Sequence, residues 1–333
     1  FLSGRIADQA GRRKVMLIGS AVTACAGFGY LVATSVVAFL ALRFFHGLST
    51  GFRPSGTSAM LTDLIPKERR GEALGYLGVA GNAGMATGPA LGSWLTVEFG
   101  IEWMFVASAL LGMVSLVVTL PLEETLPRAR PVRKSDFNLL RGPLIDPQAW
   151  PAAVLLLPIA FAFGVYLTIT PDFVEHLGYV YKGSFNTIIV ASSISMRLIA
   201  GRVSDRRGRI PVLFVGTVLM AIGMALLGVA TTKAMATLGA LVYGASVGIN
   251  MPTVFAWTAD LAQPGKVALA LGTMLMALEV GIGSGAVFSG LRFGGDVGNI
   301  PELYYTSGLG AAIAAIVLFP AFLKSLKQAK VSR

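Results

Sequence analysis

Four ionisable side chains lie inside long apolar stretches of this 333-residue chain, at Arg43, His46, Arg53 and Glu279. A charge within such a stretch is costly, so the residue normally faces a cavity or a partner and marks a possible path for ions or protons. Removal from water favours the neutral form of a carboxyl group, so Glu279 could take up and release a proton. The alternative is a structural hydrogen bond from Glu279 to Ser, Tyr or Asn on an adjacent helix.

Three of these residues and a threonine share one helical face. Arg43, His46, Thr50 and Arg53 occur at positions i, i+3, i+7 and i+10, which fall within a narrow stripe of a helix. We expect this stripe to face a cavity, with Arg43 influencing the protonation of a nearby acid. Arg43 could instead anchor two helices through a hydrogen bond without any chemical role. His46 could relay a proton or serve as a hydrogen-bonding group.

The residues for metal, redox or hydrolytic chemistry are missing from the sequence. The single cysteine, Cys25, excludes an internal disulfide and a cysteine metal cluster, and the two histidines, His46 and His176, do not make a metal site. The chain contains neither a G-x-x-x-x-G-K-[ST] nor an H-E-x-x-H motif. We therefore expect no cofactor and no enzyme activity.

Membrane-spanning helices must position these residues. The chain is 54% hydrophobic and 13% charged, whereas a soluble domain has about 25% charged residues. This composition excludes a water-soluble enzyme and a disordered chain. Apolar runs near the ~20 residues that cross a bilayer recur along the chain. We expect a stub at 1–4 and ten spans, at 15–34, 36–65, 72–97, 102–122, 150–171, 184–201, 211–231, 234–262, 267–291 and 303–323.

The basic residues alternate between the two sides of these spans. The formal net charge is +10, and 21 of the 27 Lys and Arg residues lie in every second loop, while the opposite loops hold only Lys182, Lys233 and Arg292. Cytoplasmic loops carry such an excess, so we expect a cytoplasmic C-terminus. A nucleic-acid-binding patch would be the competing interpretation of the charge, but strict alternation argues against it.

The second half of the chain repeats the first with an offset of 197 residues. GRIADQAGRRKVMLIG at 4–19 is matched by GRVSDRRGRIPVLFVG at 201–216, and Asp63 falls on Asp260 without a gap. The pattern predicts a tandem duplication of two six-helix units.

This duplication predicts an all-α polytopic membrane protein with two pseudo-symmetric six-helix bundles. We expect the first helix and most of the second to precede Phe1 in a longer, twelve-helix protein, and we see no signal peptide. The expected organisation is an incomplete N-terminal bundle at 1–123, a cytoplasmic central loop at 124–149 and a C-terminal bundle at 150–333.

One loop in each half carries glycines and charges at matching positions. They are Gly4, Asp8, Gly11, Arg12 and Arg13 in one copy, and Gly201, Asp205, Arg206, Gly208 and Arg209 in the other. Despite departures at Gln9 and Ile210, both resemble the signature G-x-L-a-D-r-x-G-r-[KR] of the major facilitator superfamily. The resemblance covers the whole chain and implies transport by alternating access.

In that family this cluster is thought to act as a conformational latch. The resemblance implies that Asp8, Arg12 and Arg13 work with Asp63, and that Asp205 and Arg209 work with Asp260. The alternative is that these residues are topology charges on the cytoplasmic side. A second segment, LRFFHGLSTG at 42–51, resembles the family's R-x-x-Q-G motif, with His46 where Gln is usual.

A third segment resembles the antiporter motif G-x8-G-x3-G-P-x2-G-G of the drug:proton antiporter branch. Its residues are Gly75, Gly84, Gly88, Pro89 and Gly92, and Ser93 replaces the last Gly. A ridge of small residues lets two helices approach closely, and Pro89 removes one backbone hydrogen bond. The resemblance implies an exporter.

The predicted function is proton-coupled efflux of small amphipathic drugs or metabolites by a monomer in the cell membrane. Its partners would be a small-molecule substrate, protons and the lipid bilayer, without nucleic acid. The alternatives are a proton symporter that imports sugar, organic acid or siderophore, and a receptor or assembly protein that does not transport. Proton-coupling acids of the family often sit on the first helix, which this chain lacks. Side chains that could line the substrate path are Tyr166, Asn250, Phe255 and Trp257.

Overall fold

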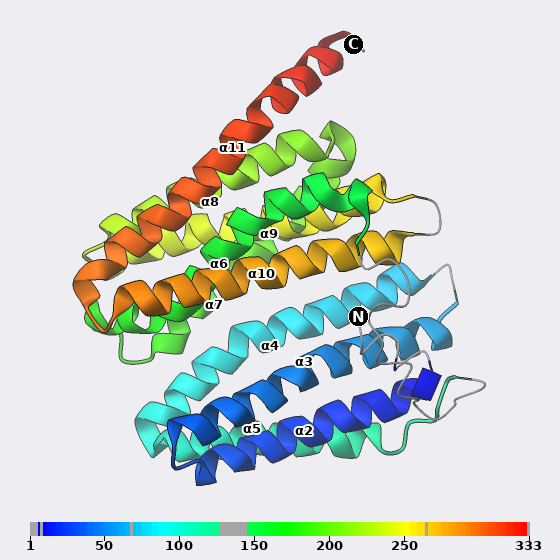
Figure 1. Cartoon of the computed structure of the whole chain (residues 1–333), viewed down its shortest axis with the longest axis vertical. Helices are drawn as coiled ribbons and strands as arrows, with labels where there is room; N and C mark the ends of the chain where they lie inside the picture. The colour runs from blue at the N-terminus through cyan, green and yellow to red at the C-terminus, as the bar shows by residue number, and fades with distance from the viewer. Residues whose placement is uncertain (1–5, 7–8, 67–68, 127–144, 264–265, 332–333) are drawn as a thin grey trace. The chain divides into compact units, whose positions relative to one another are not determined.

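The computed structural model describes residues 6, 9–66, 69–126, 145–263 and 266–331. The fold is all-α, which confirms the predicted fold class, and Figure 1 shows the helices in chain order. The helices that precede the long connection at 127–144 are α2 (Arg12–Val32), α3 (Val36–Leu64), α4 (Arg70–Phe99) and α5 (Ile101–Thr119). Those that follow it are η3 (Pro147–Ala149), α6 (Trp150–His176), α7 (Lys182–Arg207), α8 (Arg209–Val229), α9 (Lys233–Leu261), α10 (Val267–Phe293), η4 (Val297–Asn299) and α11 (Ile300–Val331).

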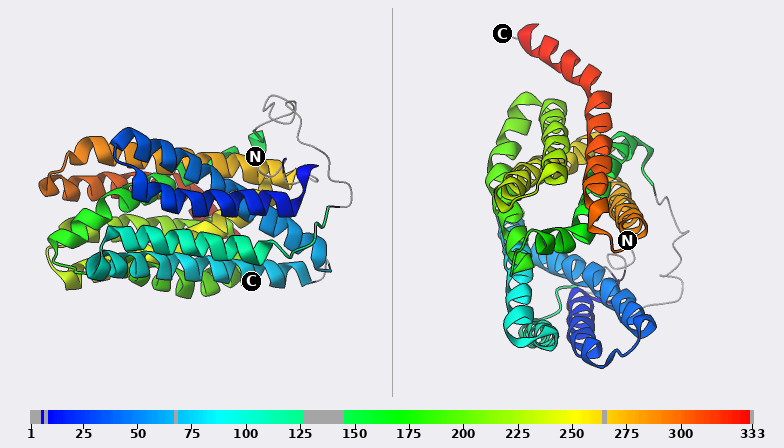
Figure 2. Two further views of the ribbon diagram at one scale, coloured as in Figure 1. Left: turned by 90° about the horizontal axis from the view of Figure 1, so that it is seen from below. Right: turned by 90° about the vertical axis from the view of Figure 1, so that its left-hand side faces the viewer.

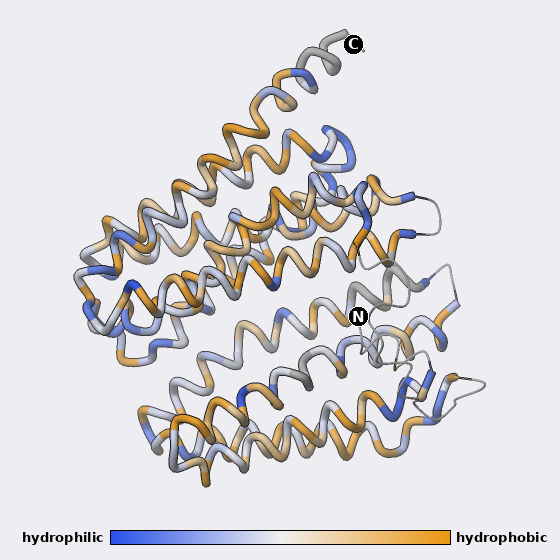
Figure 3. The backbone as a smooth tube through the Cα atoms, viewed as in Figure 1, coloured by the Kyte–Doolittle hydropathy of each residue, from blue (hydrophilic) through white to orange (hydrophobic). Residues whose placement is uncertain are grey.

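Every predicted span corresponds to one long helix. Among the described residues, eight of these helices are long and apolar enough to cross a membrane. α3 and α4 fall outside that set although they have 29 and 30 residues. α3 carries Arg43, His46 and Arg53 along its length. Figure 3 shows hydrophilic residues gathered mainly at the helix ends, with predominantly apolar residues between them.

The chain forms two compact units. Residues 1–84 and 91–142 make up the first unit, and residues 85–90 and 143–333 make up the second. In the first unit α2 packs against both α3 and α5. In the second unit α6 packs against α10, while α9 packs against α7 and α8, and α8 also packs against α11. Figure 2 shows α11 continuing beyond its neighbours toward the C-terminus.

The repeat is visible in how the helices begin. Ser35 caps α3 by accepting a hydrogen bond from the Ala38 N–H at 3.2 Å. Thr232, 197 residues later, caps α9 by accepting one from the Met235 N–H at 3.3 Å. Such caps satisfy backbone donors that the first helical turn leaves unpaired. The two halves therefore share a helix-capping residue at the same repeat position, as well as the pattern of apolar residues.

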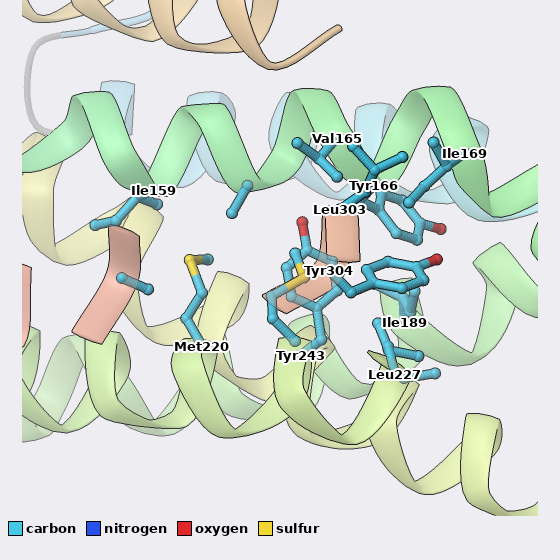
Figure 4. Packing of buried hydrophobic residues seen from close by; sticks show 14 of the residues in the cluster. Ile159, Val165, Tyr166, Ile169, Ile189, Met220, Leu227, Tyr243, Leu303 and Tyr304 are labelled. Carbon is cyan, nitrogen blue, oxygen red and sulfur yellow. The ribbon is translucent and has the colours of Figure 1, made fainter. Parts of the chain in front are cut away.

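The core of the second unit contains three buried tyrosines, Tyr166, Tyr243 and Tyr304 (Figure 4). The ring centroids of Tyr166 and Tyr243 lie 5.1 Å apart, and the hydroxyls of Tyr304 and Thr170 are 3.1 Å apart. Close helix approach supports this packing, because a Cβ added at Gly223 of α8 would lie 2.7 Å from the backbone of Tyr243.

Candidate functional site

An ionic cluster joins the start of α2 to the end of α3 in the first unit. The Nε atom of Arg12 donates to Oδ2 of Asp63 at 3.1 Å, and the Thr125 hydroxyl donates to the same oxygen at 2.9 Å. The Arg12 side chain is 12% exposed and that of Asp63 is 34% exposed. A hydrogen bond between charged groups that are partly buried is stronger than a fully exposed ion pair, because solvent screens it less. The structure thus brings together two of the residues proposed as a latch.

Glu124, which the sequence analysis did not single out, caps the N-terminus of α2. Its Oε1 accepts from the backbone N–H of Arg12 at 2.8 Å, and its Oε2 accepts from that of Arg13 at 3.1 Å. The first N–H groups of a helix lack partners within the helix, and a carboxylate there also complements the helix dipole. The two adjacent acids at 123–124, directly after an apolar span, were the available signal in the sequence.

Two further contacts complete this corner of the first unit. The Arg13 guanidinium donates to the carbonyl oxygen of Leu120 at 2.5 Å. Gly11 has φ +117°, and a Cβ there would lie 2.2 Å from Oε2 of Glu124. The glycine of the signature loop therefore leaves room for the carboxylate that caps the next helix.

A cavity of about 320 Å³ adjoins the cluster. Its lining is partly acidic and partly apolar, and consists of Met60, Asp63, Leu64, Leu122, Glu123, Glu124 and Thr125. The carboxylates of Asp63 and Glu124 therefore both border this cavity.

The second unit contains an equivalent cluster. The Nε atom of Arg209 donates to Oδ2 of Asp260 at 2.7 Å. The Nη1 atom of Arg209 donates to Oδ1 of Asp205 at 2.5 Å and to the Ser204 hydroxyl at 2.9 Å. All three of the residues predicted for the second latch are therefore in contact. Asp8, the counterpart of Asp205, lies outside the described residues.

The polar stripe on α3 contains one half-buried side chain, His46, and two exposed ones, Arg43 and Arg53. His46 is half-buried, and its Nδ1 lies 3.0 Å from the Tyr30 hydroxyl of α2. Arg53 is exposed, but its stem lies against α2, because a Cβ at Gly19 would be 2.6 Å from its Cγ. Arg43 is exposed and its guanidinium lies 5.8 Å from the centre of the Phe39 ring, a cation–π contact. The side chain of Thr50 lies outside the described residues.

The antiporter motif lies along α4. Cβ atoms added at Gly84 and Gly88 would meet no described atom within 4 Å. At Gly92 the nearest such atom is Cγ of Met104 in α5, at 3.5 Å. Within the described part of the chain, the close helix approach expected from this ridge is therefore absent at Gly84 and Gly88. The surroundings of Gly75 lie outside the described part, and Pro89 lies inside α4.

Glu279 lies on α10 and is exposed. It forms no hydrogen bond or ion pair with the residues that the structure describes, so the structural hydrogen bond considered as the alternative is not present there.

Asn250 is fully buried, and both polar atoms of its amide lack partners among the described residues. The Tyr166 hydroxyl donates to Asn186. In the described ranges, no group of three or more His, Cys, Asp or Glu side chains could hold a metal ion.

Comparisons with known proteins place this chain among membrane transporters. Multidrug resistance protein 1 of Bacillus subtilis (strain 168) is 24% identical, over 97% of this chain and 84% of its own length. Multidrug resistance protein 2 of the same organism is 24% identical over 62% of this chain, and the match spans only 54% of that relative. The solved structure of a POT family transporter in complex with 5-aminolevulinic acid superposes with a TM-score of 0.79 at 12% identity, covering 97% of this chain and 84% of that one.

The family model that matches is described as Major Facilitator Superfamily, and it matches residues 1–286 and 186–332. It covers both halves of the repeat and both ionic clusters. The solved structure supports the same fold independently of sequence identity. The chain is therefore a multi-pass membrane protein that belongs to the Major Facilitator Superfamily.

Proposed function

We propose that this protein is a secondary transporter that exports small amphipathic molecules in exchange for protons by alternating access. The observation that carries the proposal is the repeated ion pair, Arg12 with Asp63 and Arg209 with Asp260. In alternating access the substrate site opens first to one side of the membrane and then to the other. An ion pair at the same position in both duplicated units can form in one of these states and break in the other. The two pairs would then stabilise one of the alternating states.

Export rather than import is supported by the antiporter motif in α4 and by the names of the relatives. Two relatives are multidrug resistance proteins. An amphipathic substrate also suits a pathway through helices that carry few charges. The importing alternative, a proton symporter for sugar, organic acid or siderophore, shares the fold and differs in the direction of the coupled flux.

For proton coupling, we propose that Glu279 carries the proton. Arg43 and Arg53 of the first unit would interact electrostatically with charged groups along the transport pathway. Glu279 is exposed and unpaired among the described residues, so its carboxyl is available to a proton. Protonation would weaken the binding of a cationic substrate, because the attraction between opposite charges is lost. Such competition couples the two fluxes.

The alternating positive charge supports an arrangement in the cell membrane with the C-terminus in the cytoplasm. The organisation we propose is an N-terminal bundle at 1–123, a cytoplasmic central loop at 124–149 and a C-terminal bundle at 150–333, working as a monomer.

The test is proton-driven uptake by inverted membrane vesicles that contain the full-length protein. We expect an acidic vesicle lumen, from which protons flow outward in exchange, to drive accumulation of ethidium, an amphipathic fluorescent cation, and a protonophore to abolish it. An importer would instead release its substrate from such vesicles under the same gradient. If no gradient-driven flux of ethidium occurs in either direction, the result contradicts the proposed transport and favours a receptor or assembly protein that does not transport.

A further inference from the structure

An apolar groove lies between α8 and α11 of the second unit. Its cavity has a volume of about 320 Å³ and is lined only by apolar side chains, among them Phe214, Ala221 and Ile222 of α8 and Ala312, Ile316 and Phe319 of α11. Ile222, Ile316 and Phe319 are exposed, so the groove opens to the surroundings of the two helices. Both helices are long and apolar enough to cross a membrane. In a membrane protein, such a groove faces the hydrocarbon of the bilayer.

The two helices are in contact at each end of the groove. At one end, a Cβ added at Gly308 of α11 would lie 3.2 Å from Cβ of Met224 in α8. At the other end, the ring of Phe214 stacks on that of Phe322, with 4.4 Å between the ring centroids. The groove is therefore a bounded site along α8 and α11, distinct from the exposed apolar faces of the other helices.

The length of the groove suits an acyl chain. Ala221 and Ala312 are both half-buried, and their short side chains leave the space between the two end contacts. From Phe214 to Ile222 the helix rises about 12 Å. One leaflet contributes about 15 Å to the hydrocarbon core of a bilayer. An acyl chain in this groove would therefore be in contact with protein over most of its depth, and would fill the space with apolar atoms.

The aromatic end of the groove lies next to a basic end of α11. Lys324 follows Phe322 by two residues, and its side chain is exposed. In the sequence no acidic residue occurs after Glu302, and three further basic residues follow Lys324, at Lys327, Lys330 and Arg333. Figure 2 shows the C-terminal end of α11 extending past the neighbouring helices. A basic cluster at the membrane end of a spanning helix attracts anionic lipid headgroups.

We propose that the groove between α8 and α11 binds an acyl chain of one anionic phospholipid, whose headgroup lies at Lys324 and the basic end of α11. The Lys324 ammonium would donate to the headgroup phosphate. A zwitterionic phospholipid offers the same chain, but its own cation weakens the attraction, so charge sets the selectivity. In the orientation proposed above, the lipid belongs to the cytoplasmic leaflet. The inference goes beyond the proposed transport, because lipid binding requires neither substrate nor protons.

Photochemical labelling locates the lipid. The full-length protein is placed in phosphatidylcholine nanodiscs that contain a trace of phosphatidylglycerol with a diazirine in the middle of one acyl chain. After illumination, peptide mass spectrometry identifies the labelled residues. We expect the labels to concentrate at 214–222 and 312–319, and unlabelled phosphatidylglycerol to compete at least about fivefold better than phosphatidylcholine. Even labelling of all exposed apolar helix faces, or equal competition by the two lipids, would overturn the proposal.

Two variants separate the headgroup contact from the chain contact. Lys324→Gln changes an exposed residue and should weaken competition by phosphatidylglycerol about fivefold, the effect of one lysine near the membrane surface. It should leave labelling by a phosphatidylcholine probe unchanged. Ala312→Phe fills the groove and should abolish its labels. Ile313→Phe is the matched control, because Ile313 is exposed and does not line the groove. Unchanged labelling in both Lys324→Gln and Ala312→Phe would contradict the site.

A second copy of the chain is the other occupant that the test can reveal. In a Cys25→Ser background, Ala312→Cys should stay monomeric under oxidising conditions when a lipid fills the groove. A disulfide-linked dimer that lacks lipid labels would assign the groove to the second copy and overturn the proposal. The labelling is measured without ethidium or a proton gradient. Loss of lipid selectivity with intact ethidium export would therefore contradict only this inference, and the reverse result would contradict only the proposed function.

Discussion

The Nε atom of Arg209 lies 2.7 Å from Oδ2 of Asp260, and the same two atom types join Arg12 to Asp63 at 3.1 Å, 197 residues earlier. In each unit the bond links the start of one helix to the end of the next. The surroundings differ, because Arg209 also binds Asp205 and Ser204, whereas Asp63 also accepts from Thr125. The two equivalent ion pairs therefore have different hydrogen-bonding partners around them.

Asp63→Asn should destabilise the protein more than Asp260→Asn. The Asp63 side chain is 34% exposed and that of Asp260 is 53% exposed, so solvent screens the second pair more. We expect losses of about 1–2 kcal/mol for Asp63→Asn and about 0.5 kcal/mol for Asp260→Asn. Unfolding in mixed detergent micelles measures both. Equal losses would show that exposure does not set the strength of these bonds.

Glu124→Ala should cost about 1 kcal/mol of unfolding free energy, because the start of α2 loses its cap. Glu123→Ala is the matched control, since Glu123 is exposed and makes no hydrogen bond or ion pair among the described residues. Glu124→Gln should lie between the two, because an amide oxygen still accepts a hydrogen bond but brings no charge to the helix N-terminus. Thermal unfolding of the three variants in detergent tests this order, and similar midpoints for the two alanine variants would contradict it.

Gly11→Ala should destabilise the protein more than Gly208→Ala. Both glycines have positive φ, +117° and +86°, and strain of this kind costs about 1–3 kcal/mol for other residues. Only at Gly11 would the new Cβ meet a carboxylate, at 2.2 Å, whereas at Gly208 the nearest atom is 4.0 Å away. The excess should vanish when Glu124→Ala is added to Gly11→Ala. If the excess persists in that double variant, Glu124 is not its cause.

Glu279→Gln should abolish gradient-driven accumulation of ethidium while leaving counterflow exchange, which needs no net proton movement. Glutamine keeps the shape of the side chain but cannot exchange a proton at neutral pH. Asn82 is the repeat counterpart of Glu279, so Asn82→Ala serves as the control and should keep coupling. Accumulation by Glu279→Gln at the unmodified level would assign coupling to another acid.

Much of the fold follows from local pattern. Apolar length and period predict each long helix. Most ends lie within about three residues of the prediction, but α6, α7 and α11 end at His176, Arg207 and Val331, beyond the predicted ends at 171, 201 and 323. The span expected at 15–34 is the helix Arg12–Val32, because Gly11, with its positive φ, sets the start. The 197-residue repeat also predicts which acid lies near which arginine, since Asp63 and Asp260 occupy the same place in each copy.

Other parts of the site depend on contacts that no local pattern encodes. Glu124 meets the Arg12 backbone across 112 residues. The glycine ridge of α4 predicted close packing, yet Gly84 and Gly88 face open space among the described residues.

The sequence by itself determined the membrane class, the helices and their duplication, because hydropathy and helical period depend on neighbouring residues. Only the tertiary structure decided that Glu124 caps α2. The physical reason is that a backbone N–H left unpaired at a helix end can donate to any suitable acceptor that reaches it. Which partner reaches it depends on how distant helices pack.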